Sequence, residues 1–181
     1  KLVAGVKAIA TGDTVKNPDI GMGPLINKAA LEKVDSQVKQ AVKEGAKVVV
    51  GGKPMEGKGF FYEPTILTNV TQEGSAIQDE IFGPVLPVMT FKNLKDAVEM
   101  CNDSTMGLTS GIFTKSLDRA AYAINEIQAG ETYVNRNYFE AMQGYHAGVK
   151  ESGIGGSDGM HGILECTDTK VCYIQRHPED I

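Results

Sequence analysis

The chain has 181 residues, 41% of them hydrophobic, and a formal net charge of −5 at pH 7. This length and composition suit a folded globular protein rather than a disordered chain. The acidic balance argues against a nucleic-acid surface, because such surfaces need clustered cations to neutralise phosphates. The sequence has neither an opening signal peptide nor an apolar run of the roughly 20 residues that span a membrane. We therefore expect neither nucleic-acid nor membrane binding.

The first half of the chain alternates between helix and strand patterns. Residues 1–10 have amphipathic helical spacing but no capping residue, as though the helix began before residue 1. A second helix is predicted over residues 27–44, where apolar residues recur at helical spacing and Gly45 marks the end. Three short strands are then predicted, at residues 47–50, 60–62 and 65–70.

The second half continues this alternation up to residue 135. Strands are predicted at residues 85–91, 110–114 and 132–135. Two helices, at residues 93–102 and 116–128, each begin at a capping residue. Their inward faces are expected to carry Leu94, Ala97, Val98 and Cys101 in the first, and Leu117, Ala121, Ile124 and Ile127 in the second. The whole pattern predicts an α/β fold, an open twisted sheet with flanking helices.

The last part of the chain has a different character. Residues 137–162 form a long glycine-rich stretch with little periodicity, and loops of that length are usually functional or lie against another surface. Residues 167–175 alternate as a strand, which we expect to pair outside its own sheet.

The three cysteines, Cys101, Cys166 and Cys172, have no zinc-ligand spacing and no CxxC pair. This pattern predicts reduced thiols in a cytoplasmic protein and no metal site. None of the three lies at a helix start that would favour a thiolate, so the chain offers no catalytic nucleophile.

Three segments contain residues with potential chemistry. Glu80 and Phe82 flank a Gly-Pro turn, where a carboxylate could accept hydrogen bonds from a diol and a ring could lie against a flat ligand. Glu140 and His146 lie close together in the long loop and could bind a hydroxylated small molecule. The glycine-rich residues 152–159 could contact phosphate, but no GKS/T follows. From spacing alone, a structural role is favoured over a functional one for each of the three segments.

Four segments together resemble the NAD(P)-dependent aldehyde dehydrogenase family: residues 22–26 (MGPLI), 80–85 (EIFGPV), 133–135 (YVN) and 148–155 (GVKESGIG). The last is similar to the family's GG-x-K-x-S-G-x-G stretch, and the order and spacing agree over essentially the whole chain. The resemblance implies that residues 1–162 are the C-terminal part of the catalytic domain and that residues 163–181 are an oligomerisation tail. The cofactor-binding domain would then be absent.

The resemblance also implies roles for individual residues. Glu80 would hold the nicotinamide-ribose hydroxyls and Phe82 would pack beside the nicotinamide of NAD, with NADP as a possible substitute. Between Asn135 and Gly148, the FEAMQGYHAG segment is similar to one found in the lactaldehyde and glycolaldehyde dehydrogenases of the family. That similarity implies that Glu140 and His146 contact the hydroxyl end of a small hydroxyaldehyde.

The family's nucleophilic cysteine, general-base glutamate and oxyanion-stabilising asparagine would precede residue 1. We therefore expect no catalytic residue in this chain and no activity of the chain alone. A second hypothesis is a non-catalytic module that keeps the fold and forms homo-oligomers through residues 167–175. A third, phosphate binding by residues 152–159, is weaker.

Overall fold

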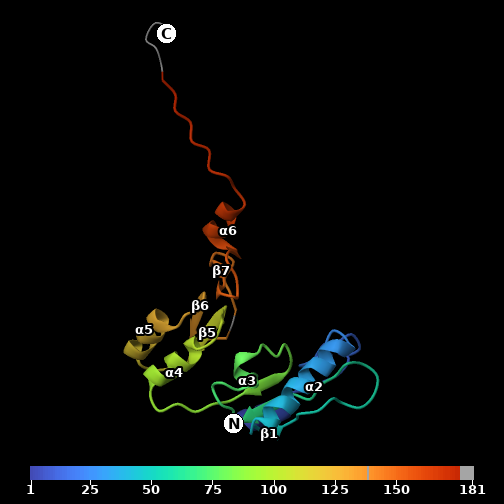
Figure 1. Ribbon diagram of the computed structural model, residues 1–181. Helices are drawn as coiled ribbons and strands as arrows, with labels where there is room; N and C mark the ends of the chain where they lie inside the picture. The colour runs from blue at the N-terminus through green and yellow to red at the C-terminus, as the bar shows by residue number, and fades with distance from the viewer. Residues whose placement is uncertain (138, 176–181) are drawn as a thin grey trace. The chain divides into compact units, whose positions relative to one another are not determined.

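The computed structural model describes residues 1–137 and 139–175 (Figure 1). Helices and strands alternate along the chain, which confirms the α/β class. The chain divides into two compact units, Lys1–Asn93 and Leu94–Ile181, which we describe separately. Across the described residues, no helix has both the length and the hydrophobicity needed to cross a membrane.

The first unit contains three helices and three strands: α1 (Leu2–Lys7), α2 (Lys28–Lys43), β1 (Lys47–Val50), β2 (Thr65–Thr68), α3 (Ser75–Gln78) and β3 (Val85–Pro87). The strands form one sheet in the order β1-β2-β3, with β1 antiparallel and β3 parallel to β2. The helix predicted over residues 27–44 is confirmed. The Asn27 side chain caps it by accepting a hydrogen bond of 2.8 Å from the Ala30 backbone amide.

The core of this unit forms between α2 and the sheet. Val34, Val38 and Ala41 on one face of α2 join Leu67 of β2 in a single buried cluster. Tyr62 belongs to the same cluster and is 1% exposed, while its hydroxyl lies 3.4 Å from Asp35 Oδ1. The apolar residues of α2, spaced at the 3.6-residue period of a helix, thus form one face that the sheet covers.

The strand predicted at residues 60–62 is wrong. Tyr62 makes only an isolated bridge with Pro54, and the Phe60 carbonyl accepts a hydrogen bond from the Leu25 amide. The aromatic residues that suggested a strand reflect burial of Tyr62 in the core instead. Apolar composition over so short a run does not distinguish a strand from a buried irregular segment.

Among its described residues, the second unit contains α4 (Leu94–Asn102), α5 (Leu117–Glu126), α6 (Gly159–Glu165) and six short strands. The strands are β4 (Met106–Gly107), β5 (Thr109–Ile112), β6 (Glu131–Val134), β7 (His146–Ala147), β8 (Val149–Lys150) and β9 (Gly156–Ser157). They pair as β5 with β6 in parallel, and as β4 with β8 and β7 with β9 in antiparallel. Across the described residues of both units, the strands form one three-stranded sheet and three two-stranded sheets.

The predicted inward face of α5 is wrong. The buried residues of α5 are Ala120 and Ala123, while Leu117 is 83% and Ile124 is 51% exposed. Cys101, also predicted to face inward on α4, is exposed. The helices α4 and α5 pack together, and the buried face of α5 consists of small alanines rather than large apolar side chains.

The long glycine-rich stretch is more regular than its sequence indicates. It contains β7, β8, β9 and the start of α6; residue 138 lies outside the described residues. Two-residue strands are too short to leave a periodic pattern in the sequence. The predicted boundary between residues 162 and 163 falls within α6.

The described tail, residues 167–175, forms no strand within this chain. Its apolar side chains are exposed, including Val171, Tyr173 and Ile174. Pairing outside the chain's own sheets therefore stays a prediction, and residues 176–181 of the predicted oligomerisation tail lie outside the described residues.

Candidate functional site

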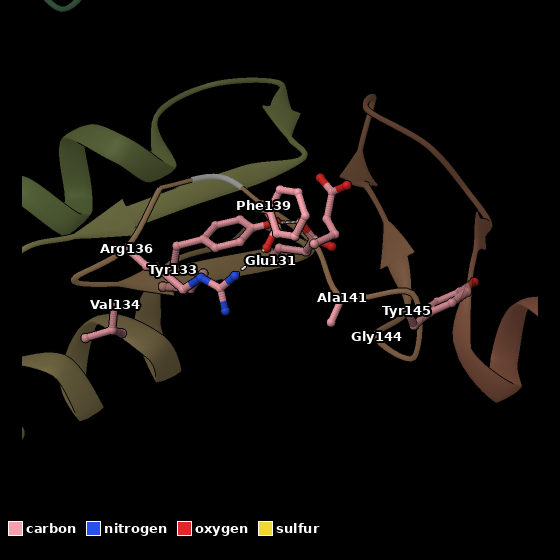
Figure 2. A pocket seen from close by; sticks show the side chains of 10 residues that line it. Glu131, Tyr133, Val134, Arg136, Phe139, Ala141, Gly144 and Tyr145 are labelled. Atoms are coloured by element: carbon pink, nitrogen blue, oxygen red, sulfur yellow. Dashed lines mark hydrogen bonds between the residues drawn. The ribbon is translucent and has the colours of Figure 1, made fainter.

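The second unit contains a hollow of about 330 Å³ between β6 and the segment that follows it (Figure 2). Its lining is partly charged and partly aromatic, and includes Glu131, Tyr133, Arg136, Phe139, Glu140 and Tyr145. A pocket of this size with a few convergent polar groups is typical of a small-molecule site.

Strand β6 positions the first two of these residues. Glu131 pairs with Thr109 and Tyr133 with Gly111 in the parallel β5–β6 ladder. Because alternate residues of a strand share a face, Glu131 and Tyr133 lie on the same side. The Tyr133 hydroxyl donates a hydrogen bond of 2.6 Å to Glu131 Oε2 (Figure 2). This hydrogen bond is the main reason that the pKa of Tyr133 rises to about 12.

His146 on β7 contacts two carboxylates. Its Nδ1 lies 3.0 Å from Glu131 Oε1 and 3.6 Å from Glu140 Oε1. The hydrogen bond to Glu131 is the main cause of the raised pKa of His146, which desolvation partly opposes. Desolvation alone would raise the pKa of Glu131, but the hydrogen bonds from Tyr133 and His146 outweigh it and lower that pKa. The pair therefore favours an ionised carboxylate beside a readily protonated imidazole.

The two predicted substrate residues are thus brought together. Glu140 lines the hollow directly, whereas His146 lies beside it through its contacts with Glu131 and Glu140. The loop that carries Glu140 is braced by Arg136, whose Nη2 donates a hydrogen bond of 2.6 Å to the Phe139 carbonyl. Sequence reasoning missed Glu131 as a site residue. The available signal was a carboxylate just before the strand predicted at residues 132–135, two residues from Tyr133.

Glu131, Glu140 and His146 also offer three ligand atoms that lie within 4.8 Å of one another. A carboxylate–carboxylate–imidazole set is one that a divalent cation can use. However, the short Glu131–His146 contact has the geometry of a hydrogen bond in which Nδ1 carries a proton. The hydrogen-bonded arrangement accounts for this cluster without an ion.

The glycine-rich residues 152–159 allow close backbone contacts within this unit, and this role explains their glycines without a phosphate ligand. Gly156 of β9 pairs with Ala147 of β7, and a Cβ on Gly156 would lie 2.2 Å from the His146 carbonyl oxygen. The Ser152 hydroxyl accepts a hydrogen bond of 2.8 Å from the Gly107 amide. These glycines allow the strand beside His146 to approach closely.

Residues of two other matched segments, Lys150 and Asn135, stabilise the structure of this unit. Lys150 Nζ donates hydrogen bonds of 2.7 and 2.9 Å to the carbonyls of Asn102 and Ser104, at the C-terminal end of α4. A cation there complements the helix dipole. The Asn135 side chain both accepts from the Thr114 amide and donates to the Thr114 carbonyl, which holds the end of β6 against the segment after β5.

The predicted cofactor residues, Glu80 and Phe82, lie in the first unit on the loop between α3 and β3. Both are exposed, whereas Ile81 between them is 8% exposed and anchors the loop in the core. Phe82 has a left-handed φ of 51°. The Lys33 ammonium donates a hydrogen bond to the Glu80 carbonyl and lies 5.8 Å from the centre of the Phe82 ring.

Gly83 allows this loop to approach α2. A Cβ on Gly83 would lie 2.5 Å from Val34 Cγ2, and Val34 is 1% exposed and cannot move aside. Gly83 and Pro84 also line a hollow of about 350 Å³ together with residues 22–25. Two of the matched motifs therefore meet at one place, and the Glu80 and Phe82 side chains are accessible to a ligand that has a diol and a flat ring.

The chain is similar to known aldehyde dehydrogenases in both sequence and structure. The model of the aldehyde dehydrogenase family matches residues 1–172. The chain is 53% identical to lactaldehyde dehydrogenase of Escherichia coli over 175 residues, and 40% identical to 3,6-anhydro-alpha-L-galactose dehydrogenase of a Vibrio species over 173 residues. These alignments cover 97% and 93% of the chain, respectively.

Solved structures give the same result. The structure of E. coli lactaldehyde dehydrogenase superimposes with a TM-score of 0.94 at 52% identity, covering 97% of this chain and 37% of that one. Betaine aldehyde dehydrogenase of Staphylococcus aureus, in complex with NAD+, gives a TM-score of 0.86 at 34% identity, covering 91% of this chain and 33% of that one. The chain spans 36% of the length of each of the two relatives compared by sequence. From residue 1 to residue 172, this chain belongs to the aldehyde dehydrogenase family.

Proposed function

We propose that this chain is part of a cytoplasmic NAD(P)-dependent aldehyde dehydrogenase that oxidises small hydroxyaldehydes, such as lactaldehyde and glycolaldehyde, to hydroxy acids. The observation that carries the proposal is the meeting of Glu140 and His146 beside a hollow lined by charged and aromatic residues, with Glu140 Oε1 3.6 Å from His146 Nδ1. The identity to lactaldehyde dehydrogenase supports the choice of substrate class.

The chemistry of the substrate explains why polar groups suit this hollow. A two- or three-carbon hydroxyaldehyde has little apolar surface, so hydrogen bonds must supply most of its specificity. A carboxylate accepts from the substrate hydroxyl, and an imidazole can donate to it or accept from it. Glu140 and His146 together provide both kinds of partner.

The first unit supplies the cofactor side of the proposal. Glu80 would accept hydrogen bonds from the ribose hydroxyls, and the exposed ring of Phe82 would lie against the nicotinamide. Bound NAD(P)+ supplies the hydride acceptor. The NAD+ complex of the related betaine aldehyde dehydrogenase supports NAD as the cofactor.

Replacing Glu80 by glutamine in the full-length protein is expected to raise KM for NAD+ about tenfold, because a charge-assisted hydrogen bond becomes a neutral one. KM for the aldehyde should change far less. The measurement is steady-state NADH formation with each substrate varied in turn. An unchanged NAD+ profile would remove Glu80 from the cofactor site.

No residue of this chain is proposed as the nucleophile. A purified protein of these 181 residues is therefore expected to form no NADH from NAD+ and glycolaldehyde above the buffer rate. The full-length protein should form NADH faster from glycolaldehyde than from acetaldehyde. Turnover by the short protein would show that it holds its own nucleophile, and a preference of the long protein for acetaldehyde would contradict the proposed substrate class.

The exposed tail favours a second proposal, that residues 163–181 mediate homo-oligomerisation while residues 1–162 belong to the catalytic domain. Exposed Val171, Tyr173 and Ile174 give the described part of the tail an apolar surface suited to pairing with another chain. On the alternative hypothesis of a non-catalytic module, such pairing would be the chain's sole activity. Aldehyde-dependent NADH formation by the full-length protein would exclude that hypothesis.

A further inference from the structure

We infer that Glu131 is the positioning residue for His146: it holds the imidazole by Nδ1, which leaves Nε2 as the ring nitrogen that meets the substrate hydroxyl. The inference rests on the proposed function, because it assigns a task to His146 in hydroxyaldehyde binding. It adds a residue that the resemblance did not indicate.

The three side chains form a continuous hydrogen-bonded series. The Tyr133 hydroxyl donates to Glu131 Oε2 at 2.6 Å, and Glu131 Oε1 lies 3.0 Å from His146 Nδ1. Because an ionised carboxylate only accepts, the Nδ1 atom must carry the proton in this contact. In the neutral imidazole, Nε2 is then the acceptor, and in the charged form Nε2 is a donor.

Glu131 is better placed than Glu140 to hold the His146 imidazole. Glu131 is closer to Nδ1, at 3.0 Å against 3.6 Å, and its side chain is 15% exposed against 43% for Glu140. Both oxygens of Glu131 already have partners, Tyr133 and His146. Glu131 is therefore fixed, whereas Glu140 has exposed surface with which to contact a ligand.

The backbone holds both ends of the contact. Glu131 is paired with Thr109 in the β5–β6 ladder, and His146 is paired with Ser157 in the β7–β9 ladder. Residues on paired strands hold a more precise geometry than residues on loops. The orientation of the imidazole is thus a property of the fold, present before substrate binds.

The surroundings of His146 are acidic. Glu131, Glu140 and Asp158 are the charged groups that act on it, and each raises its pKa. Of these, Glu131 has the largest effect, through its hydrogen bond. Loss of the Glu131 charge must therefore lower the pKa of His146 towards the ordinary histidine value.

The test compares Glu131→Ala and Glu131→Gln with the wild type in the full-length protein, with Glu99→Gln as the control. Glu99 lies on α4 with a side chain that is 66% exposed, outside the site. Glu131→Ala is expected to raise KM for glycolaldehyde about tenfold with less change for acetaldehyde, since the imidazole loses its orientation. Glu131→Gln should recover much of this loss, because its amide oxygen still accepts from Nδ1–H.

The pH profile separates positioning from a general structural role. In Glu131→Gln, the midpoint of the pH dependence of KM for glycolaldehyde should move to lower pH, because the imidazole loses its proton more easily. Tyr133→Phe should shift the same midpoint less, since it leaves the Glu131 charge in place. Equal losses on both aldehydes with an unmoved midpoint would overturn the inference.

A second readout separates this inference from the proposed function. NMR of ¹⁵N-histidine-labelled full-length protein, with His146 assigned by its loss in His146→Gln, reports the tautomer and the titration of the ring directly. The wild type should show an Nδ1-protonated neutral ring, and Glu131→Ala should lose that preference. If the enzyme does not prefer hydroxyaldehydes while the NMR result holds, the proposed substrate fails and the positioning stands. An Nε2-protonated ring in the wild type overturns the positioning whatever the kinetics show.

Discussion

In the full-length protein, His146→Ala and Glu140→Ala are each expected to reduce kcat/KM for glycolaldehyde about 10- to 100-fold. The loss corresponds to one hydrogen bond between a charged group and the substrate hydroxyl, about 1.5–3 kcal/mol. Acetaldehyde lacks the hydroxyl that these residues would bind, so its kcat/KM should change less than about threefold. The consequence of either substitution is a loss of discrimination between the two aldehydes.

The measurement is steady-state kinetics with both aldehydes at saturating NAD+. Glu99→Ala serves as the matched control, since it removes an exposed carboxylate of the same unit that pairs with Lys95 on α4, away from the candidate site. Equal losses on both aldehydes would show that Glu140 and His146 support the fold and do not recognise the substrate hydroxyl.

Gly130→Ala is expected to destabilise the second unit by about 3 kcal/mol or more. A Cβ on Gly130 would lie 1.6 Å from the Ala147 carbonyl oxygen, so the backbone of β6 and that of β7 would have to separate. Glu131 and His146 are the neighbours of these two residues in sequence. The substitution should therefore disturb the 3.0 Å contact between them as well as the stability.

Thermal and urea unfolding of the full-length protein measure the first effect. Gly5→Ala is the control. Apart from its chain neighbours and its own helix, no atom of the described residues lies within 4 Å of a Cβ at Gly5, and alanine favours the helix α1. A Gly130→Ala protein as stable as the wild type would mean that the two segments are further apart than the structure places them.

Helix α2 of the first unit follows closely from the sequence, because its two ends depend on local chemistry. The limits of α2 are set by the Asn27 cap and by Gly45, whose φ is +107°. The predicted inward face of α5 is wrong for a different reason. The helical face was predicted from the spacing of large apolar residues such as Leu117 and Ile124. The residues that are buried in the structure are the small Ala120 and Ala123.

In the candidate site, too, some residues could be predicted from the sequence and others could not. The resemblance indicated Glu140 and His146, which are six residues apart in one recognisable stretch. It did not indicate Glu131, because its contact with His146 depends on the pairing of β6 with β5 and of β7 with β9. Two of these strands, β7 and β9, are only two residues long, which is too short for a period-2 pattern.

The backbone of Phe82 has a consequence for the evolution of this chain. A left-handed φ of 51° costs a bulky residue about 1 kcal/mol relative to glycine, and the ring is 73% exposed, so burial does not offset that cost. Selection for heat resistance alone would therefore favour Gly or Asn at this position. A lineage that retains an aromatic residue here accepts a lower melting temperature in exchange for the ring.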